Sequence, residues 1–306
     1  MSAATLDAAA LALRPGTSDA EIESAAALEL AARKRMVLFW RILLLVVLIG
    51  GWEFFTRTGE IKDWLFGPLA KPRPSMVDPF FFSNPSSIVQ RLYEWATEGT
   101  TLGSLWWQIG VTFYEAVLGF LSGAVAGVLA GVALGRNRLL ADIFSIYIKI
   151  ANAIPRVVLA PIFIIAFGFG TLSKVAVSFV MVFFVVFANA FQGVREADRA
   201  MIANAQILGA SPWQVTRSVI VPSALSWIFA SLHVSFGFAI VGAVVGELLG
   251  SRAGIGQLIA VAQGSFDPAG VFAGMIVLLI VAIAADYGMS AIERVLVKWR
   301  PEENRE

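Results

Sequence analysis

The sequence predicts an all-α integral membrane protein with about six transmembrane helices. Hydrophobic residues make up 58% of its 306 residues and charged residues 15%, and the mean hydropathy is +0.77. A soluble domain has roughly 45–50% apolar and about 25% charged residues. The apolar residues also fall into long runs, and a run of about 20 is what a helix needs to cross the hydrocarbon core.

Six runs are long enough to be spans, and the positions of the charged residues orient them. The runs lie at 37–56, 107–134, 143–168, 173–193, 224–249 and 270–291. Most Lys and Arg residues fall on the cytoplasmic side if both termini are cytoplasmic, as the positive-inside rule requires. We therefore expect a cytoplasmic N-terminal segment at 1–36, a first span at 37–56, an extracytoplasmic loop at 57–106, a core of five spans at 107–298 and a cytoplasmic tail at 299–306.

Two shorter helices are expected outside the spans. Ser18 and Glu21 form a capping box before a run that ends at the basic residues 33–35, which predicts a cytosolic or interfacial helix. A partly disordered tail is the alternative there. In the outer loop, the turn residues 84–87 precede an amphipathic helix at 88–95.

Composition excludes several kinds of chemistry. The chain has no cysteine, which rules out disulfides and thiol catalysis, and its single histidine, His233, rules out a histidine-rich metal centre. The net charge of +1 offers no charge argument for nucleic acid. No phosphate-binding G-x-x-x-x-G-K-[ST] motif occurs, which agrees with a chain that binds no nucleotide itself. We identify no catalytic, cofactor-binding or metal residues in this sequence.

Glycines recur at every fourth position of the second predicted span, at Gly119, Gly123, Gly127 and Gly131. This spacing leaves one helical face smooth, so that another backbone can approach closely. Packing within the chain and a subunit interface are both compatible with the pattern. The fifth span carries a similar series at Gly242, Gly246 and Gly250.

Ionisable residues inside spans are costly, so each needs a reason. Lys149 and Arg156 lie within the third span, about two helical turns apart, where they would attract an anion along a translocation path. The alternative is that their side chains snorkel to the interface, or pair with Asp142 or Glu115. Near the outer end of the fifth span, Glu247 would pair with Arg252, either in a gate or structurally.

Prolines and polar residues within the spans have simpler expectations. Pro155 and Pro161 are expected to bend the third span, because proline removes helix hydrogen bonds. Asp286 in the sixth span suits capping or pairing. We expect His233 to be a packed hydrogen-bonding residue rather than a proton carrier.

The most informative segment is the cytoplasmic stretch 194–223. Residues 199–208 predict a short helix, which Gly209 would end in the left-handed conformation. Ser211 then caps a second helix, with Pro212 at its first position and Gln214 completing a capping box. This helix is expected to run to Val221 and to stop at Pro222. Docking of a partner and a purely structural hairpin are both compatible with this element.

This segment resembles the EAA loop of binding-protein-dependent ABC importer permeases. Gly209 and Pro222 match the motif's glycine and proline, and residues 219 and 221 match its apolar positions. Two positions depart, because Ala203 stands in place of the glutamate and Asn204 in place of the first alanine. The resemblance covers roughly residues 84–298, and the segments 155–170, 242–247 and 251–256 look like the nitrate/sulfonate/taurine branch.

The resemblance implies a type I ABC importer permease fold in the bacterial cytoplasmic membrane. It implies a second permease copy, most simply a homodimer, a cytosolic ATPase dimer that uses ATP and Mg, and an extracytoplasmic solute-binding protein that delivers a small anionic solute. The residues implied in ATPase coupling are Ala203, Asn204, Ala205, Leu208, Gly209, Ala210, Ser211, Pro212, Trp213 and Pro222.

Two other classes of protein are alternatives. An ion-coupled secondary transporter would use acidic residues near the midplane, where only Glu115 and Glu247 come close, and would show inverted repeats. A membrane-embedded enzyme would need a catalytic pair. Ser231 and Ser235 flank His233, but residues two apart do not share a helix face.

Overall fold

A computed structural model describes residues 19–66 and 82–296 of the chain, and the described part is almost entirely helical without a β-strand. It divides into two compact units, residues 1–86 and residues 87–306. The expectations for residues 1–18, including Ser18, and for residues 67–81 and 297–306 lie outside the described residues.

The first unit is dominated by one helix, α2 (Asp19–Phe66), which is 48 residues long. Its apolar stretch Leu30–Arg57 is long enough to cross a membrane. The expected separation of an N-terminal helix ending at residues 33–35 from a span at 37–56 is wrong. No glycine or proline interrupts the chain there, and Arg, Lys and Met are all good helix formers, so the helix continues.

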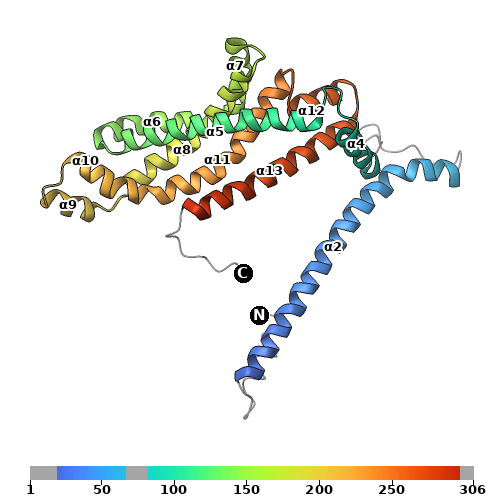
Figure 1. The fold of residues 1–306 in the computed structure, drawn as a ribbon, viewed down its shortest axis with the longest axis horizontal. Helices are drawn as coiled ribbons and strands as arrows, with labels where there is room; N and C mark the ends of the chain where they lie inside the picture. The colour runs from blue at the N-terminus through green and yellow to red at the C-terminus, as the bar shows by residue number, and fades with distance from the viewer. Residues whose placement is uncertain (1–18, 67–81, 297–306) are drawn as a thin grey trace. The chain divides into compact units, whose positions relative to one another are not determined.

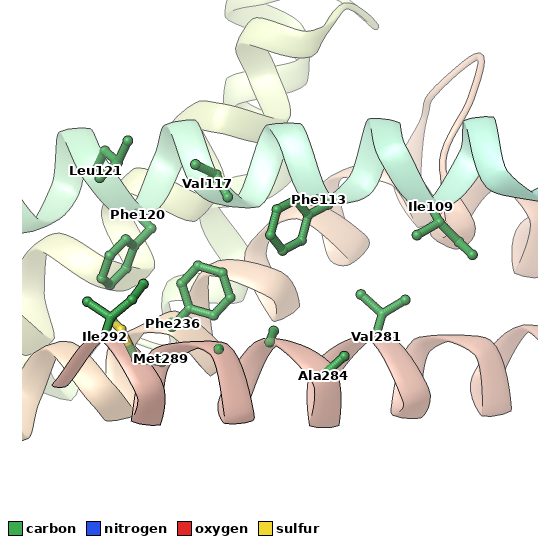
Figure 2. A pocket seen from close by; sticks show the side chains of 12 residues that line it. Ile109, Phe113, Val117, Phe120, Leu121, Phe236, Val281, Ala284, Met289 and Ile292 are labelled. Atoms are coloured by element: carbon green, nitrogen blue, oxygen red, sulfur yellow. The ribbon is translucent and has the colours of Figure 1, made fainter. Parts of the chain in front are cut away.

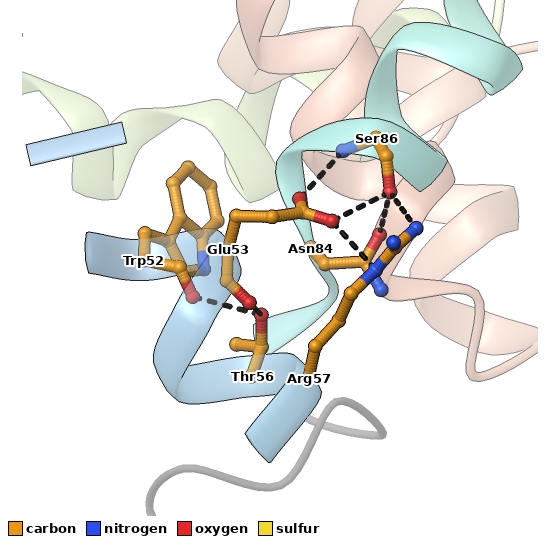
Figure 3. A network of polar contacts seen from close by, with 6 residues as sticks. All are labelled: Trp52, Glu53, Thr56, Arg57, Asn84 and Ser86. Atoms are coloured by element: carbon orange, nitrogen blue, oxygen red, sulfur yellow. Dashed lines mark hydrogen bonds and ion pairs between the residues drawn. The ribbon is translucent and has the colours of Figure 1, made fainter. Parts of the chain in front are cut away.

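A polar cluster within the first unit includes Ser86, which lies in the first turn of α4 (Pro85–Thr97) (Figure 3). The Glu53 carboxylate accepts hydrogen bonds from the backbone N–H and the hydroxyl of Ser86, both at 3.0 Å. Arg57 pairs with the same carboxylate at 2.7 Å and donates to the Ser86 hydroxyl at 3.0 Å. The carboxylate thus satisfies an N–H group at the start of α4 that has no partner inside the helix.

The second unit contains four long helices that lie alongside one another (Figure 1). They are α5 (Leu105–Gly135), α8 (Thr171–Arg195), α11 (Val221–Leu249) and α13 (Pro268–Leu296). They confirm the spans predicted at 107–134, 173–193, 224–249 and 270–291. Each is long and apolar enough to cross a membrane, as is the apolar stretch of α2.

Two shorter helices lie near one end of this unit. The amphipathic helix predicted at 88–95 is confirmed as α4, which buries Ile88 and Trp95. The segment 250–269, which lies between the last two predicted spans, contains the ten-residue helix α12 (Ile255–Gly264). Its apolar face is buried, but ten residues are too few to span, and a search for spans therefore misses it.

The third predicted span, 143–168, is not one continuous helix. It consists of α6 (Arg138–Ala153), a 3₁₀ turn (Arg156–Leu159) and α7 (Ala160–Phe167), and the two parts meet at 82°. The predicted bend at Pro155 is confirmed. A residue before proline is pushed out of the α region, and Ile154 is extended with ψ 126°. Pro161 lies in the first turn of α7, where proline is tolerated.

The glycine series of α5 lies against α8. A Cβ at Gly123 would be 2.7 Å from the carbonyl oxygen of Phe179, and one at Gly131 would be 2.8 Å from that of Phe187. The glycines of α11 approach another side of α8, where a Cβ at Gly242 would be 2.7 Å from the Cα of Ser178. Backbone therefore touches backbone on two sides of α8, and the contact of the α5 series lies within the chain.

We predict that Gly131→Ala destabilises the protein and that Gly110→Ala, on the same helix, does not. The added methyl group at residue 131 would meet Ala190 and the α8 backbone at less than 3 Å, whereas nothing lies within 4 Å of a Cβ at residue 110. Overpacking of this kind costs roughly 1–3 kcal/mol of unfolding free energy. Thermal unfolding in detergent, monitored by size-exclusion chromatography, measures the difference in melting temperature between the two variants. Equal melting temperatures would show that α5 and α8 are not packed this tightly.

Candidate functional site

A surface hairpin, formed by α9 (Arg199–Ile207) and α10 (Pro212–Val215), lies at one end of the second unit (Figure 1). Asp198 caps α9 by accepting the N–H of Ala200 at 2.7 Å. Gly209 then turns the chain with φ +82°, which confirms the predicted left-handed cap. The N–H of Ala210 donates to the carbonyl of Ala205 at 3.0 Å and closes the end of the helix.

The second arm of the hairpin begins with the predicted capping box. The Ser211 hydroxyl accepts the N–H of Gln214 at 3.3 Å, and the Gln214 side chain accepts the N–H of Ser211 at 2.8 Å. Pro212 occupies the first turn, where its missing N–H costs nothing. Both arms are therefore defined by short-range hydrogen bonds.

The tip and the base of this hairpin differ in exposure. Ile207 is 82% exposed, Leu208 87% and Trp213 64%. At the base, Val215 and Ile220 are buried in an apolar cluster whose other members come from α8, from the link between α8 and α9, and from α11, namely Ala190, Val194, Ala197, Ala224 and Ile228. The hairpin is thus anchored firmly while it presents large apolar side chains at its tip.

The hairpin continues into α11 without a break, so the expected stop at Pro222 is wrong. The segment Thr216–Ile220 is π-helical, and the N–H of Val221 donates to the carbonyl of Thr216, five residues back. In a regular α-helix the ring of Pro222 would clash with the carbonyl of Ser218, and the wider π turn relieves this contact. Any force on the hairpin therefore reaches α11 directly.

A buried polar cluster lies at the other end of the unit and holds the start of α12. Three consecutive N–H groups, at 254–256, donate to the side chains of Gln108 at 2.7 Å, Thr112 at 2.8 Å and Glu247 at 2.7 Å. The Thr112 hydroxyl in turn donates to the Glu247 carboxylate at 2.8 Å. Side chains of α5 and α11 thus satisfy the N–H groups that a helix start leaves unpaired.

The same cluster contains buried ionisable residues that lie far apart in the sequence. Glu247 is fully buried and does not pair with Arg252, which is exposed. Lys174 is also fully buried, and its ammonium group donates to the carbonyls of Phe169 and Gly170. The Oε2 atom of Glu115 is buried without a hydrogen-bond partner. In the sequence, the position of Lys174 near the start of an otherwise apolar span was the signal that could have revealed this cluster.

The two basic residues proposed for the translocation path lie on the broken third span. Lys149 is exposed on α6. Arg156 donates to the side-chain oxygen of Asn152 at 2.7 Å and lies over the ring of Phe184 at 5.4 Å, while its Nε atom has no hydrogen-bond partner. Arg156 pairs with neither suggested carboxylate, because Asp142 contacts Arg195 at 3.4 Å instead.

His233 lies between α11 and α13 and contacts two carboxylates of α13, although its Nδ1 atom has no hydrogen-bond partner among the described residues, so its predicted hydrogen-bonding role stays a prediction. Its Nε2 lies 3.1 Å from Asp286, which confirms the pairing expected for that carboxylate, and its Nδ1 lies 3.2 Å from Glu293. Ser231 and Ser235 donate to backbone carbonyls of their own helix. No serine–histidine pair of the kind needed for catalysis is formed by these three residues.

An apolar groove of about 470 Å³ lies between α5 and α13 (Figure 2). Phe113 and Phe120 of α5, Phe236 of α11, and Val281 and Ile292 of α13 are among its lining residues. None of the lining side chains carries a charge or a hydrogen-bonding group. A charged solute would lose its hydration there without compensation, so this groove is not a binding site for an ion.

We predict that Thr112→Val destabilises the protein by about 1–3 kcal/mol, because the buried Glu247 carboxylate loses one of its two donors and the N–H of Ile255 loses its acceptor. Thr112→Ser keeps the hydroxyl and should retain most of the stability. Ser122→Ala, on an exposed part of the same helix, is the matched control. Thermal unfolding compares the three variants. A valine variant as stable as the serine variant would show that the Thr112 hydroxyl does not stabilise the buried polar cluster.

Comparisons with known proteins add evidence from sequence to this geometry. The family described as binding-protein-dependent transport system inner membrane component matches residues 123–298. A putative aliphatic sulfonates transport permease protein of Bacillus subtilis is 33% identical over 198 residues, which cover 65% of this chain and 72% of that protein. A riboflavin transport system permease protein of Chloroflexus aurantiacus is 31% identical over 220 residues, covering 72% and 81%.

A taurine transport system permease protein of Escherichia coli is 28% identical over 228 residues, covering 74% of this chain and 83% of that protein. Among solved structures, an inward-facing MetNI methionine ABC transporter has a chain that aligns with a TM-score of 0.50 at 20% identity. The alignment covers 62% of this chain and 93% of that one. At this identity the structural likeness concerns the fold.

Proposed function

The chain belongs to the binding-protein-dependent transport system inner membrane components, the membrane-embedded permeases of bacterial ABC importers, and we propose that it moves a small anionic solute by coupling to a separate ATPase through the α9–α10 hairpin. In this proposal the hairpin end faces the cytoplasm. ATP and Mg are used by the partner ATPase dimer, and a solute-binding protein delivers the solute from the opposite side.

The observation that carries the coupling role is the contrast between the tip and the base of the hairpin. The exposed tip residues Ile207, Leu208 and Trp213 offer apolar surface to a partner, whereas the base is continuous with α11 and packed on α8. A rigid exposed element that is joined directly to transmembrane helices suits force transfer. Ala203 and Asn204 carry no charge, so docking at this hairpin depends on apolar contact.

The anionic character of the solute is supported by Arg156 and Lys149. Both basic residues lie on the broken third span, and the guanidinium Nε of Arg156 has an unused hydrogen atom. Sulfonates and taurine, named for two of the relatives, share a sulfonate group that an arginine binds well. Helix α6 ends at Ala153, just before Pro155, which places this arginine at a break in the third span, and transporters commonly bind solute at such breaks.

We propose that two copies of the chain enclose the path within the bilayer. Many apolar side chains of α6 and α7 are exposed in the single chain, including Tyr147, Ile150 and Ile165. An ion-coupled transporter is the weaker alternative, because none of the relatives reported above is one and Glu247, one of the two acidic residues that it would use, holds the start of α12.

We predict that Gly209→Arg abolishes transport and loses the ATPase, because arginine is strained at φ +82° and disorders the turn of the hairpin. Gly209→Asn is the matched control, since asparagine tolerates the left-handed region and should keep the partner. A pull-down of the tagged chain from its native membrane in mild detergent, with mass spectrometry, measures the co-purifying ATPase. Co-purification undiminished in the arginine variant, at normal expression, would contradict docking at the hairpin.

We predict that Arg156→Gln lowers the uptake of an alkanesulfonate or of taurine by about tenfold, equivalent to about 1.4 kcal/mol of lost interaction. Arg156→Lys keeps the charge and should lose less. Arg136→Gln, at an exposed position just after α5 and outside the hairpin, controls for the loss of a positive charge elsewhere. Uptake of radiolabelled solute into cells checks the series, and equal uptake in the glutamine variant and the unaltered protein would remove Arg156 from the path.

A further inference from the structure

The turn between α12 and α13 holds an aromatic residue in an unfavourable backbone conformation. Phe266 has φ +54°, in the left-handed region that a bulky residue rarely adopts. Its side chain is 76% exposed. Such conformations persist only where the surrounding structure enforces them, and they concentrate at sites of function. The turn therefore keeps a large apolar ring exposed at an energetic cost.

Hydrogen bonds on both sides of Phe266 enforce this conformation. The N–H of Phe266 donates to the carbonyl of Gln263 at 3.2 Å, and that of Asp267 donates to the carbonyl of Ala262 at 2.9 Å. The Asp267 carboxylate accepts the N–H of Gly270 at 3.0 Å and lies 3.3 Å from Arg91 of α4. The turn is thus tied to α12, to α13 and to α4.

The far end of α12 is equally fixed. Its first N–H groups, at 254–256, are held by Gln108, Thr112 and Glu247 in the buried polar cluster. A helix held at both ends presents its terminal turn with little conformational freedom. An aromatic side chain on such a rigid support loses little entropy when a partner binds, which is the property of a binding anchor.

The position of the turn indicates the partner. It lies at the end of the second unit that is opposite the α9–α10 hairpin (Figure 1). If the hairpin faces the ATPase, as proposed above, the turn faces the side from which solute arrives. Its neighbours Gln263, Ser265 and Asp267 are polar, while the apolar face of α12 is buried within the protein. The ring therefore extends from a polar surface rather than from a lipid-facing apolar stripe.

We propose that Phe266 is an anchor for the solute-binding protein on which this transporter family depends, inserting its ring into an apolar pocket on that protein. This inference rests on the proposed orientation of the hairpin. It assigns a partner contact to a single turn and predicts that the ring, rather than the backbone of the turn, carries the affinity.

The first test places the photocrosslinker p-benzoylphenylalanine at position 266 of the full chain in living cells, and at Tyr93 as the matched control. Tyr93 is an exposed aromatic residue on α4, at the same end, with ordinary helical backbone. The expected result is a light-dependent adduct at position 266 with an extracytoplasmic solute-binding protein, identified by mass spectrometry, and none at position 93. Adducts of position 266 only with lipid or with a second permease copy would overturn the proposal.

The second test measures the affinity of that purified binding protein for the assembled transporter in nanodiscs. Phe266→Asn keeps the left-handed backbone and removes the ring, so its Kd should rise by at least about tenfold. Phe266→Tyr keeps the ring and should bind like the unaltered protein, as should Tyr93→Asn. An unchanged Kd in the asparagine variant overturns the proposal. Because the Gly209 variants test ATPase docking separately, a failure at Phe266 with an intact ATPase complex counts only against this inference.

Discussion

The close contact of α8 with α5 and α11 is the constraint on which the rest of the second unit depends. Glycines allow these backbones to touch, and the side chains beside them interlock with α8. A slip of one residue along α5 would replace Gly123 by Ala124 or Ser122 against the Phe179 carbonyl. Sliding is therefore blocked, and the three helices must move as one body. Small residues that permit close approach here make the structure stiff rather than mobile.

The two ends of this rigid body are held by different chemistry. At the hairpin, an apolar cluster around Val215 and Ile220 joins the surface element to α8 and α11. At the opposite end, Glu247, Thr112 and Lys174 supply buried charges and hydrogen bonds. Burying charge is costly and contributes little net stability, but it tolerates few alternative arrangements. A polar cluster of this kind therefore suits the task of fixing the orientation of α12 and of the turn before α8.

Features that depend on residues close together in the sequence could be predicted, whereas features that depend on distant residues could not. The Gly209 turn and the Ser211–Gln214 capping box were predictable because their partners lie within a few residues, and the long spans because hydropathy is a property of a single segment. Glu247 was matched with nearby Arg252, but its true partner Thr112 lies 135 residues away. Pro222 was expected to end a helix, and a π turn, which only the packing of the base selects, accommodates it.

The continuity from hairpin to α11 has a consequence for how the permease would change state. A hairpin joined to α8 and α11 cannot tilt alone, because its base belongs to the same packed body as the glycine contacts. Movement at Leu208 would then appear at the α12–α13 turn as a rotation of the whole body rather than as a local rearrangement. The break at Pro155, by contrast, separates α6 and α7 by 82° and leaves α7 less constrained by such contacts. The relative motion that alternating access requires is therefore best sought between α6 and α7 on one side and the α5–α8–α11 body on the other.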